Sequence, residues 1–129
     1  MVEVAVTCTN ATLDVDEEGT FRLRWTPGTT VSVADAAAII AAVQGATVSG
    51  LQPMMVEVAD VALTAEARKL LLGTRFVRAV ALIGATVVDR VVAAALLRGE
   101  VSPHGYFTSE DAAREWLGQL RVSDALEAV

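Results

Sequence analysis

The chain has 129 residues, a length typical of a single domain, and hydrophobic residues make up 53% of it, which excludes an intrinsically disordered protein. The 16 acidic residues outnumber the 10 basic ones and give a net charge of −6. This charge argues against nucleic-acid binding and against docking on an anionic membrane, because both need a cationic face. The single cysteine allows no internal disulfide and fits a reducing compartment.

Neither a targeting segment nor a membrane span is predicted. The N-terminal sequence MVEVAVTCTN lacks the cationic start of a signal peptide. The longest uncharged apolar run, Ala79–Val88, falls well short of the roughly 20 residues that a spanning helix needs. We therefore expect a cytoplasmic protein.

The first quarter of the chain has the alternation of β-strands. Val2–Thr7 alternates with a period of two, Ala11–Val15 continues as an extended segment, and Gly19 closes an acidic turn. Phe21–Trp25 then places three apolar side chains on one face and two arginines on the other. This pattern predicts an antiparallel hairpin that ends at Thr26–Gly28.

A period of 3.6 residues follows and predicts a helix. Ser32 is a good N-cap, Asp35 stands at the capping-box position, and Gly45 is a C-terminal stop signal. The apolar residues that fall on one face of it are Val33, Ala36, Ala37, Ile40 and Val43.

Two βα units come next. Met54–Ala59 and Arg78–Ile83 are short, almost entirely apolar runs, as expected of central strands covered on both faces. Thr64 can cap a helix through Leu72, and Thr86 can cap a second one, with Asp89 at its box position and Gly99 as its stop.

The chain ends with a short strand at Tyr106–Phe107 and a helix capped by Thr108 or Ser109. We expect Trp116 and Leu117 on the inner face of this helix. Residues 1–120 are predicted to form one domain, and residues 121–129 a frayed C-terminal tail.

Together these elements predict an α/β fold. An N-terminal antiparallel β-hairpin is followed by βα units, which form a central mixed sheet flanked by about four helices. Parallel βαβ units are expected because strands alternate with helices.

Several local strings, taken in this order, carry a resemblance that extends over most of residues 2–120. They are Trp25–Gly28, Ser32–Ala36, Val56–Arg68, Ala79–Leu82 leading to Asp89–Val92, and Phe107–Leu117. The succession resembles the SpoIIAA-like (STAS-like) superfamily, and is most similar to small bacterial STAS/SEC14-domain-like proteins of unassigned role. The resemblance implies a SpoIIAA-like fold and a non-enzymatic regulatory or binding module.

In anti-anti-sigma members of that superfamily, a Ser or Thr at the start of the helix after a central strand is phosphorylated, usually within Asp-Ser-x-Gly. The matching stretch here is Asp60–Arg68, in which Thr64 is the only hydroxyl and no glycine follows it. Thr64 is thus a candidate phosphoacceptor, or simply a helix cap. Arg68 could grip a phosphate or a partner carboxylate, or be a solvated surface charge. Asp60 could bind a ligand at the end of its strand, or cap the turn.

The helix after Thr86 is unusually apolar, because its only polar residues up to Leu97 are Asp89 and Arg90. So many apolar side chains cannot all face one sheet. The side of this helix that faces away from the sheet could be covered by neighbouring helices, by another copy of the chain, or by a hydrophobic ligand. The candidate residues for an oligomer or ligand surface are Val88, Val91, Val92, Ala95 and Leu96.

No constellation for catalysis or metal binding is found. His104 and Cys8 could form a dyad only if the thiol were activated, and the acidic run from Asp14 to Glu18 fits a solvated turn. The sequence therefore predicts no enzyme and no cofactor. The leading hypothesis is a protein-interaction or regulatory module, a homo-oligomer with a dimer favoured, which could bind a regulatory protein partner. The alternative is a carrier or sensor of a small hydrophobic ligand.

Overall fold

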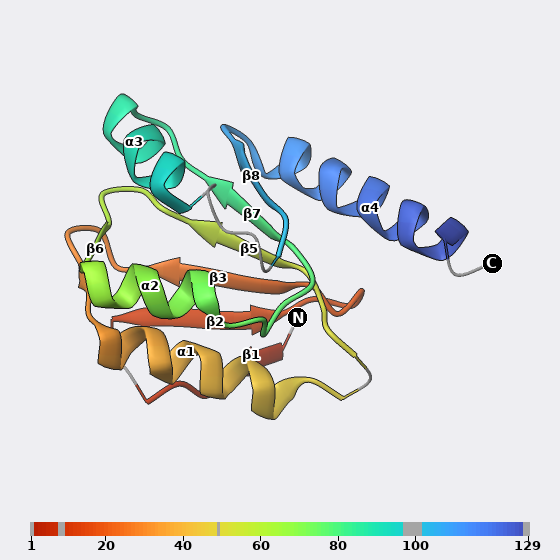
Figure 1. The fold of residues 1–129 in the computed structure, drawn as a ribbon, viewed down its shortest axis with the longest axis horizontal. Coiled ribbons are helices and arrows are strands. Elements are labelled where there is room, and N and C mark those ends of the chain that lie inside the picture. The colour runs from red at the N-terminus through yellow and green to blue at the C-terminus, as the bar shows by residue number, and fades with distance from the viewer. Residues whose placement is uncertain (1, 8–9, 49, 97–101, 128–129) are drawn as a thin grey trace.

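The computed structural model describes residues 2–7, 10–48, 50–96 and 102–127, with only the backbone described from residue 121 onward. It confirms the predicted α/β fold, with a six-stranded mixed sheet and four helices in the described ranges (Figure 1). The strands of the sheet, in spatial order, are β1 (Val2–Val4), β2 (Ala11–Val15), β3 (Phe21–Trp25), β5 (Met54–Glu57), β7 (Val80–Ile83) and β8 (His104–Phe107). The helices are α1 (Val33–Ala46), α2 (Ala65–Gly73), α3 (Val87–Leu96) and α4 (Glu110–Glu127).

The sheet is antiparallel at one edge and parallel elsewhere. Strands β1, β2 and β3 pair antiparallel, and β3, β5, β7 and β8 pair parallel. Each crossover from β3 onward moves one strand in the same direction, so right-handed connections bring α1, α2 and α3 to one face. These three helices share the larger core with that face, while α4 packs on the other face against β7 and β8 (Figure 1).

Each described helix begins at a hydroxyl residue that the sequence pointed to. The hydroxyl oxygens of Ser32, Thr64 and Ser109 accept hydrogen bonds from backbone N–H groups three residues later, at 3.2, 3.1 and 3.2 Å. At the start of α1 the Asp35 carboxylate completes the predicted capping box by accepting from the Ser32 N–H at 3.0 Å. Local capping therefore sets where the helices start.

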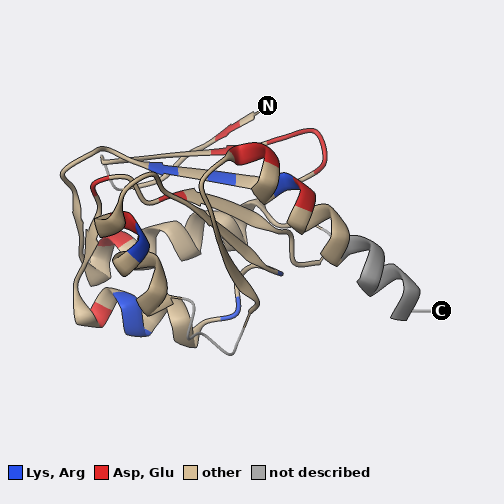
Figure 2. Cartoon of the chain, turned by 90° about the horizontal axis from the view of Figure 1, so that it is seen from above, with Lys and Arg blue, Asp and Glu red and all other residues tan. Residues whose placement is uncertain are grey.

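Helix α4 is held by apolar packing and by ion pairs. Leu117 is buried, and Trp116 packs its ring against Phe107 with centroids 5.4 Å apart, as the sequence predicted for these core anchors. Arg114 binds the Asp16 carboxylate at 2.9 Å, and Arg22 pairs with Glu110. Figure 2 shows these opposite charges side by side where the acidic turn meets the start of α4.

Three details differ from the predictions. Helix α4 continues to Glu127, so residues 121–127 are helical where a frayed tail was expected. Gly45, predicted to stop the first helix, lies inside α1. The helix ends one residue later, where the Thr47 hydroxyl donates to the Val43 carbonyl at 2.7 Å. Two strands of two residues, β4 (Thr30–Val31) and β6 (Ala62–Leu63), pair in parallel and were missed, because two residues carry no detectable period.

Candidate functional site

One buried carboxylate organises the edge of the sheet where the parallel strands end. Asp89 is only 3% exposed. Its Oδ2 accepts hydrogen bonds from the N–H groups of Ala85 and Thr86 at 2.9 and 3.0 Å, and its Oδ1 accepts from the N–H of Asp60 at 3.1 Å. These bonds, led by that from Ala85, hold the pKa of Asp89 below its ordinary value. The carboxylate thus ties the start of α3 to the turn after β5.

The Asp60 turn is fixed on both sides. Asp60 has a φ of +52°, the left-handed region that non-glycine residues seldom adopt, and its carbonyl accepts from the Gly28 N–H at 2.8 Å. Its side chain is exposed at the carboxyl end of the strands, where open α/β sheets bind ligands. The sequence pointed to Asp60 but treated Asp89 as a helix-box residue alone. The link between them is a contact across 29 residues, which no local pattern contains.

Thr64 and Arg68 lie at the start of α2. The Thr64 hydroxyl is used as the helix cap, since it accepts from the Ala67 N–H at 3.1 Å. Arg68 is exposed one turn later. In the part of the chain that the structure describes, no ion pair joins Arg68 to Asp60. The three predicted residues therefore share one edge of the molecule without forming a single cluster.

The outer face of α3 is apolar and uncovered. Val87, Val88 and Val91 are 80%, 69% and 66% exposed, while Val92 and Ala95 are half-buried. Leu96 instead is buried in the core, so it does not belong to this surface. In the part of the chain that the structure describes, no neighbouring helix covers the three valines. We call Val87, Val88 and Val91 the valine face.

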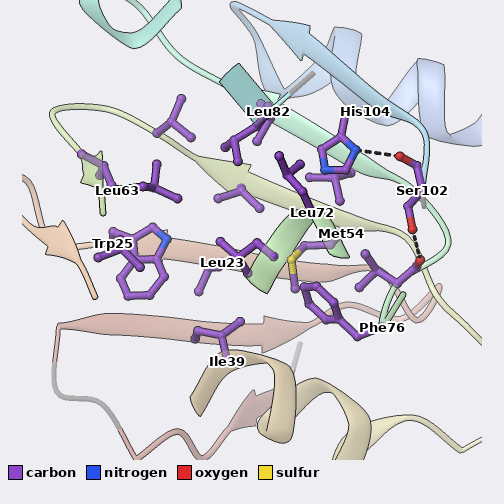
Figure 3. Close-up of a pocket in the computed structure, with 18 of the residues that line it drawn as sticks. Leu23, Trp25, Ile39, Met54, Leu63, Leu72, Phe76, Leu82, Ser102 and His104 are labelled. Carbon is purple, nitrogen blue, oxygen red and sulfur yellow. Dashed lines mark hydrogen bonds between the residues drawn. The ribbon is translucent and has the colours of Figure 1, made fainter. Parts of the chain in front are cut away.

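A cavity of about 60 Å³ lies beneath the helices, on the face of the sheet that α1, α2 and α3 cover (Figure 3). Leu96 lines it, so this residue remains a candidate for the ligand alternative only. The wall is almost entirely aliphatic or aromatic. Among the lining residues are Leu23, Trp25, Ile39, Met54, Val56, Val58, Leu63, Leu72, Phe76, Val80 and Leu82.

Two polar side chains of the wall, His104 and Ser102, lie beside each other toward one end of the cavity (Figure 3). His104 Nδ1 lies 2.7 Å from the Ser102 carbonyl oxygen, and the buried Ser102 hydroxyl donates to the Val77 carbonyl at 2.9 Å. Burial lowers the pKa of His104, outweighing its bond to Ser102, so the ring is neutral at neutral pH. The sequence pointed to His104 only as a catalytic partner. The signal for a place in the cavity wall is the alternation in β8, which puts His104 and Tyr106 on the same face of the sheet.

Among the described residues, the structure identifies no further candidate for catalysis or metal binding. Cys8 and Gly99 lie outside the described residues, so the Cys8–His104 dyad has no geometry to judge. Among the described residues, no group of three or more His, Cys, Asp or Glu side chains could hold a metal ion. Within the same ranges, none of the helices combines the length and apolar character needed to cross a membrane.

Comparisons with known proteins bear on the fold. An uncharacterized protein of the DUF3478 family from Shewanella loihica PV-4, described as having a SpoIIAA-like fold, superposes with a TM-score of 0.63. The match covers 88% of this chain and 98% of that protein, at 13% sequence identity. No family model matches the chain, and the search of curated proteins finds no match. The likeness confirms the predicted SpoIIAA-like fold.

Proposed function

From this SpoIIAA-like scaffold, we propose that the chain is a non-catalytic, cytoplasmic protein-interaction module that pairs with a second copy of itself through the valine face of α3. The observation that carries the proposal is the exposure of Val87, Val88 and Val91, which are adjacent on one helix. Single apolar residues on a surface are ordinary, but a contiguous group of them is typical of an interaction site.

The distribution of charge favours a second copy of the chain as the partner that covers the valine face. A net charge of −6 makes two copies repel each other over most of their surface, so they can approach only where acidic side chains are absent. Helix α3 exposes no acidic side chain, because its only carboxylate, Asp89, is buried. A two-fold axis beside α3 would bring the same valines together from both chains, with no carboxylate among them and with the exposed Arg90 at their edge.

The anchoring of α3 supports this role. The three hydrogen bonds to Asp89 fix the first turn of the helix, which carries Val87 and Val88. A surface held in place before binding loses little conformational entropy on association. The exposed side chains of Asp60 and Arg68 lie at the same edge and are available to a regulatory protein partner in this proposal.

The test is the mass of the protein in solution, measured by native mass spectrometry and by sedimentation over a concentration series. We expect a species at twice the 13.5 kDa chain mass for the wild type, and a monomer for Val91→Glu. Val48→Glu is the matched control, because Val48 is equally apolar, 96% exposed and outside α3. A wild type that stays monomeric at about 100 μM, a concentration well above micromolar dissociation constants, would refute the proposal. So would a folded Val91→Glu variant that keeps the dimer mass.

A further inference from the structure

The charged residues of the chain are unevenly distributed. Residues 61–96, which include α2 and α3, hold five of the 10 basic residues but only two of the 16 acidic ones, and one of these two, Asp89, is buried. Figure 2 shows acidic residues gathered around the turn after β2 and the start of α4, with basic residues of the helix layer on the opposite side. A chain whose net charge is −6 therefore has a cationic region of its own.

Three exposed cations lie on α2 and on the loop that follows it. They are Arg68, Lys69 and Arg75, which we call the basic patch. In the described ranges, none of the three takes part in an ion pair. On the other face of the sheet, by contrast, Arg22 and Arg114 both pair with carboxylates. The cations of the basic patch are therefore available to the carboxylates of a partner.

Little negative charge surrounds the basic patch. Glu66 is the only carboxylate of α2 and lies in its first turn. The helix packed beside α2 is α1, whose single charged residue is Asp35 (Figure 1). The Asp35 carboxylate is half-buried and accepts a hydrogen bond from the Ser32 N–H in the helix cap. Glu66 is thus the one fully exposed carboxylate on the two helices, so an acidic segment can lie on them with little repulsion.

The basic patch is separated from the acidic face of the molecule. Helix α2 packs on the face of the sheet opposite to α4. The thickness of a helix, about 10 Å, and the sheet itself therefore lie between the outer side of α2 and the acidic residues of α4. The Debye length at physiological ionic strength is about 8 Å. The acidic face is thus largely screened from the patch, whereas an anion in contact with the patch is not.

The charge of the rest of the chain limits which anions fit. A nucleic-acid duplex or an anionic membrane extends well beyond three side chains and meets the acidic remainder of the molecule. A short acidic segment of a protein covers the basic patch alone. Two of the three cations are arginines, whose planar guanidinium groups match carboxylates in geometry as well as in charge.

We propose that the basic patch binds a short acidic segment of another protein, with Arg68, Lys69 and Arg75 each pairing with a carboxylate of that segment. This partner deepens the proposed function, on which it rests for the existence of a regulatory protein. The basic patch itself is separate from the valine face, which lies on α3.

The probe is hexaglutamate, followed by amide NMR shifts of the full chain at about 20 mM salt. Hexaglutamine is the uncharged control. We expect saturable shifts at Arg68, Lys69 and Arg75 with hexaglutamate and none with hexaglutamine. Raising the salt to about 200 mM should weaken binding about 3-fold or more, because exposed ion pairs are screened. Absence of saturable binding, equal binding of the two peptides, or shifts confined to other parts of the chain would overturn the proposal.

Single variants test the basic patch itself. Arg68→Gln, Lys69→Gln and Arg75→Gln each remove one cation, and glutamine has a helix propensity close to that of arginine and lysine. Each should weaken hexaglutamate binding about 1.4- to 5-fold, the range of one exposed ion pair, and the triple variant about 3-fold or more. Arg90→Gln is the matched control, because Arg90 is also exposed and, among the described residues, unpaired, but lies on α3. Equal losses in Arg68→Gln and Arg90→Gln would show a general effect of net charge and refute the assignment.

Other occupants of the basic patch give different results. Tighter binding of a short DNA duplex, or of vesicles that contain phosphatidylserine, than of hexaglutamate would assign the patch to phosphate groups and overturn the proposal. Salt-sensitive species heavier than a dimer that disappear in the triple variant would mean that the patch binds the acidic face of another copy, which would also overturn it.

The valine face is tested separately. Val91→Glu should bind hexaglutamate with wild-type affinity, because the substitution lies on α3 and not on α2. A monomeric wild type that binds hexaglutamate would refute the dimer and leave the basic patch standing. A dimer that does not bind hexaglutamate would refute the basic patch alone.

Discussion

Asp89 shows how one side chain can hold two loops that are distant in the sequence. Its carboxylate accepts from the N–H groups of Ala85 and Thr86 at the start of α3 and from that of Asp60 after β5. The Asp60 backbone is in the left-handed region, a conformation that persists only where its surroundings enforce it. Asp89 and the bond from Gly28 to the Asp60 carbonyl supply that enforcement.

The first prediction at the scale of residues concerns acid stability. The hydrogen bonds from Ala85, Asp60 and Thr86 hold the pKa of Asp89 below its ordinary value in the folded chain, so the ionised carboxylate stabilises the fold at neutral pH. That stabilisation is lost as the pH falls through the folded pKa. We expect Asp89→Asn to unfold at lower urea concentration than the wild type at pH 7, and the difference to shrink as the pH falls below the ordinary pKa of an aspartate, about 3.9. Glu115→Gln, an exposed site on α4, is the control. A difference that does not change between pH 7 and pH 3 would contradict this account.

At the scale of elements, the two sides of α3 differ in burial. Its inner side buries Ala93 and Leu96, and its outer side exposes the valine face. The sequence already showed more apolar surface than one sheet could cover, but not which side chains would be left out. Val92, half-buried between the two sides, marks the boundary.

That boundary gives a prediction that separates folding from association. In a Val91→Glu background, where dimerisation makes no contribution, Val92→Glu should lower the free energy of unfolding by about 1–3 kcal/mol, because it forces a charge toward the core. Val88→Glu should change it by no more than about 0.5 kcal/mol. Urea unfolding of both variants measures the difference. Equal losses would mean that Val88 is packed as closely as Val92, against its 69% exposure.

The elements that the sequence predicted correctly are those with strong local signals. Ser32, Thr64 and Ser109 cap helices because each side chain bonds to its own backbone three residues on. The central strands follow from their unbroken apolar runs. What local patterns could not predict depends on contacts distant in the chain: the Asp89–Asp60 bond, the β4–β6 pair, and the cavity that His104 enters from the edge strand.

At the scale of the whole molecule, the valine face and the cavity share α3 but lie at different distances from its anchor. Asp89 fixes the first turn, and Val88 and Val91 are within two residues of it, about 3 Å along the axis. Leu96 is seven residues on, about 10 Å away, and lines the cavity. The valine face therefore lies beside the anchor, and Leu96 lies about two helical turns away from it.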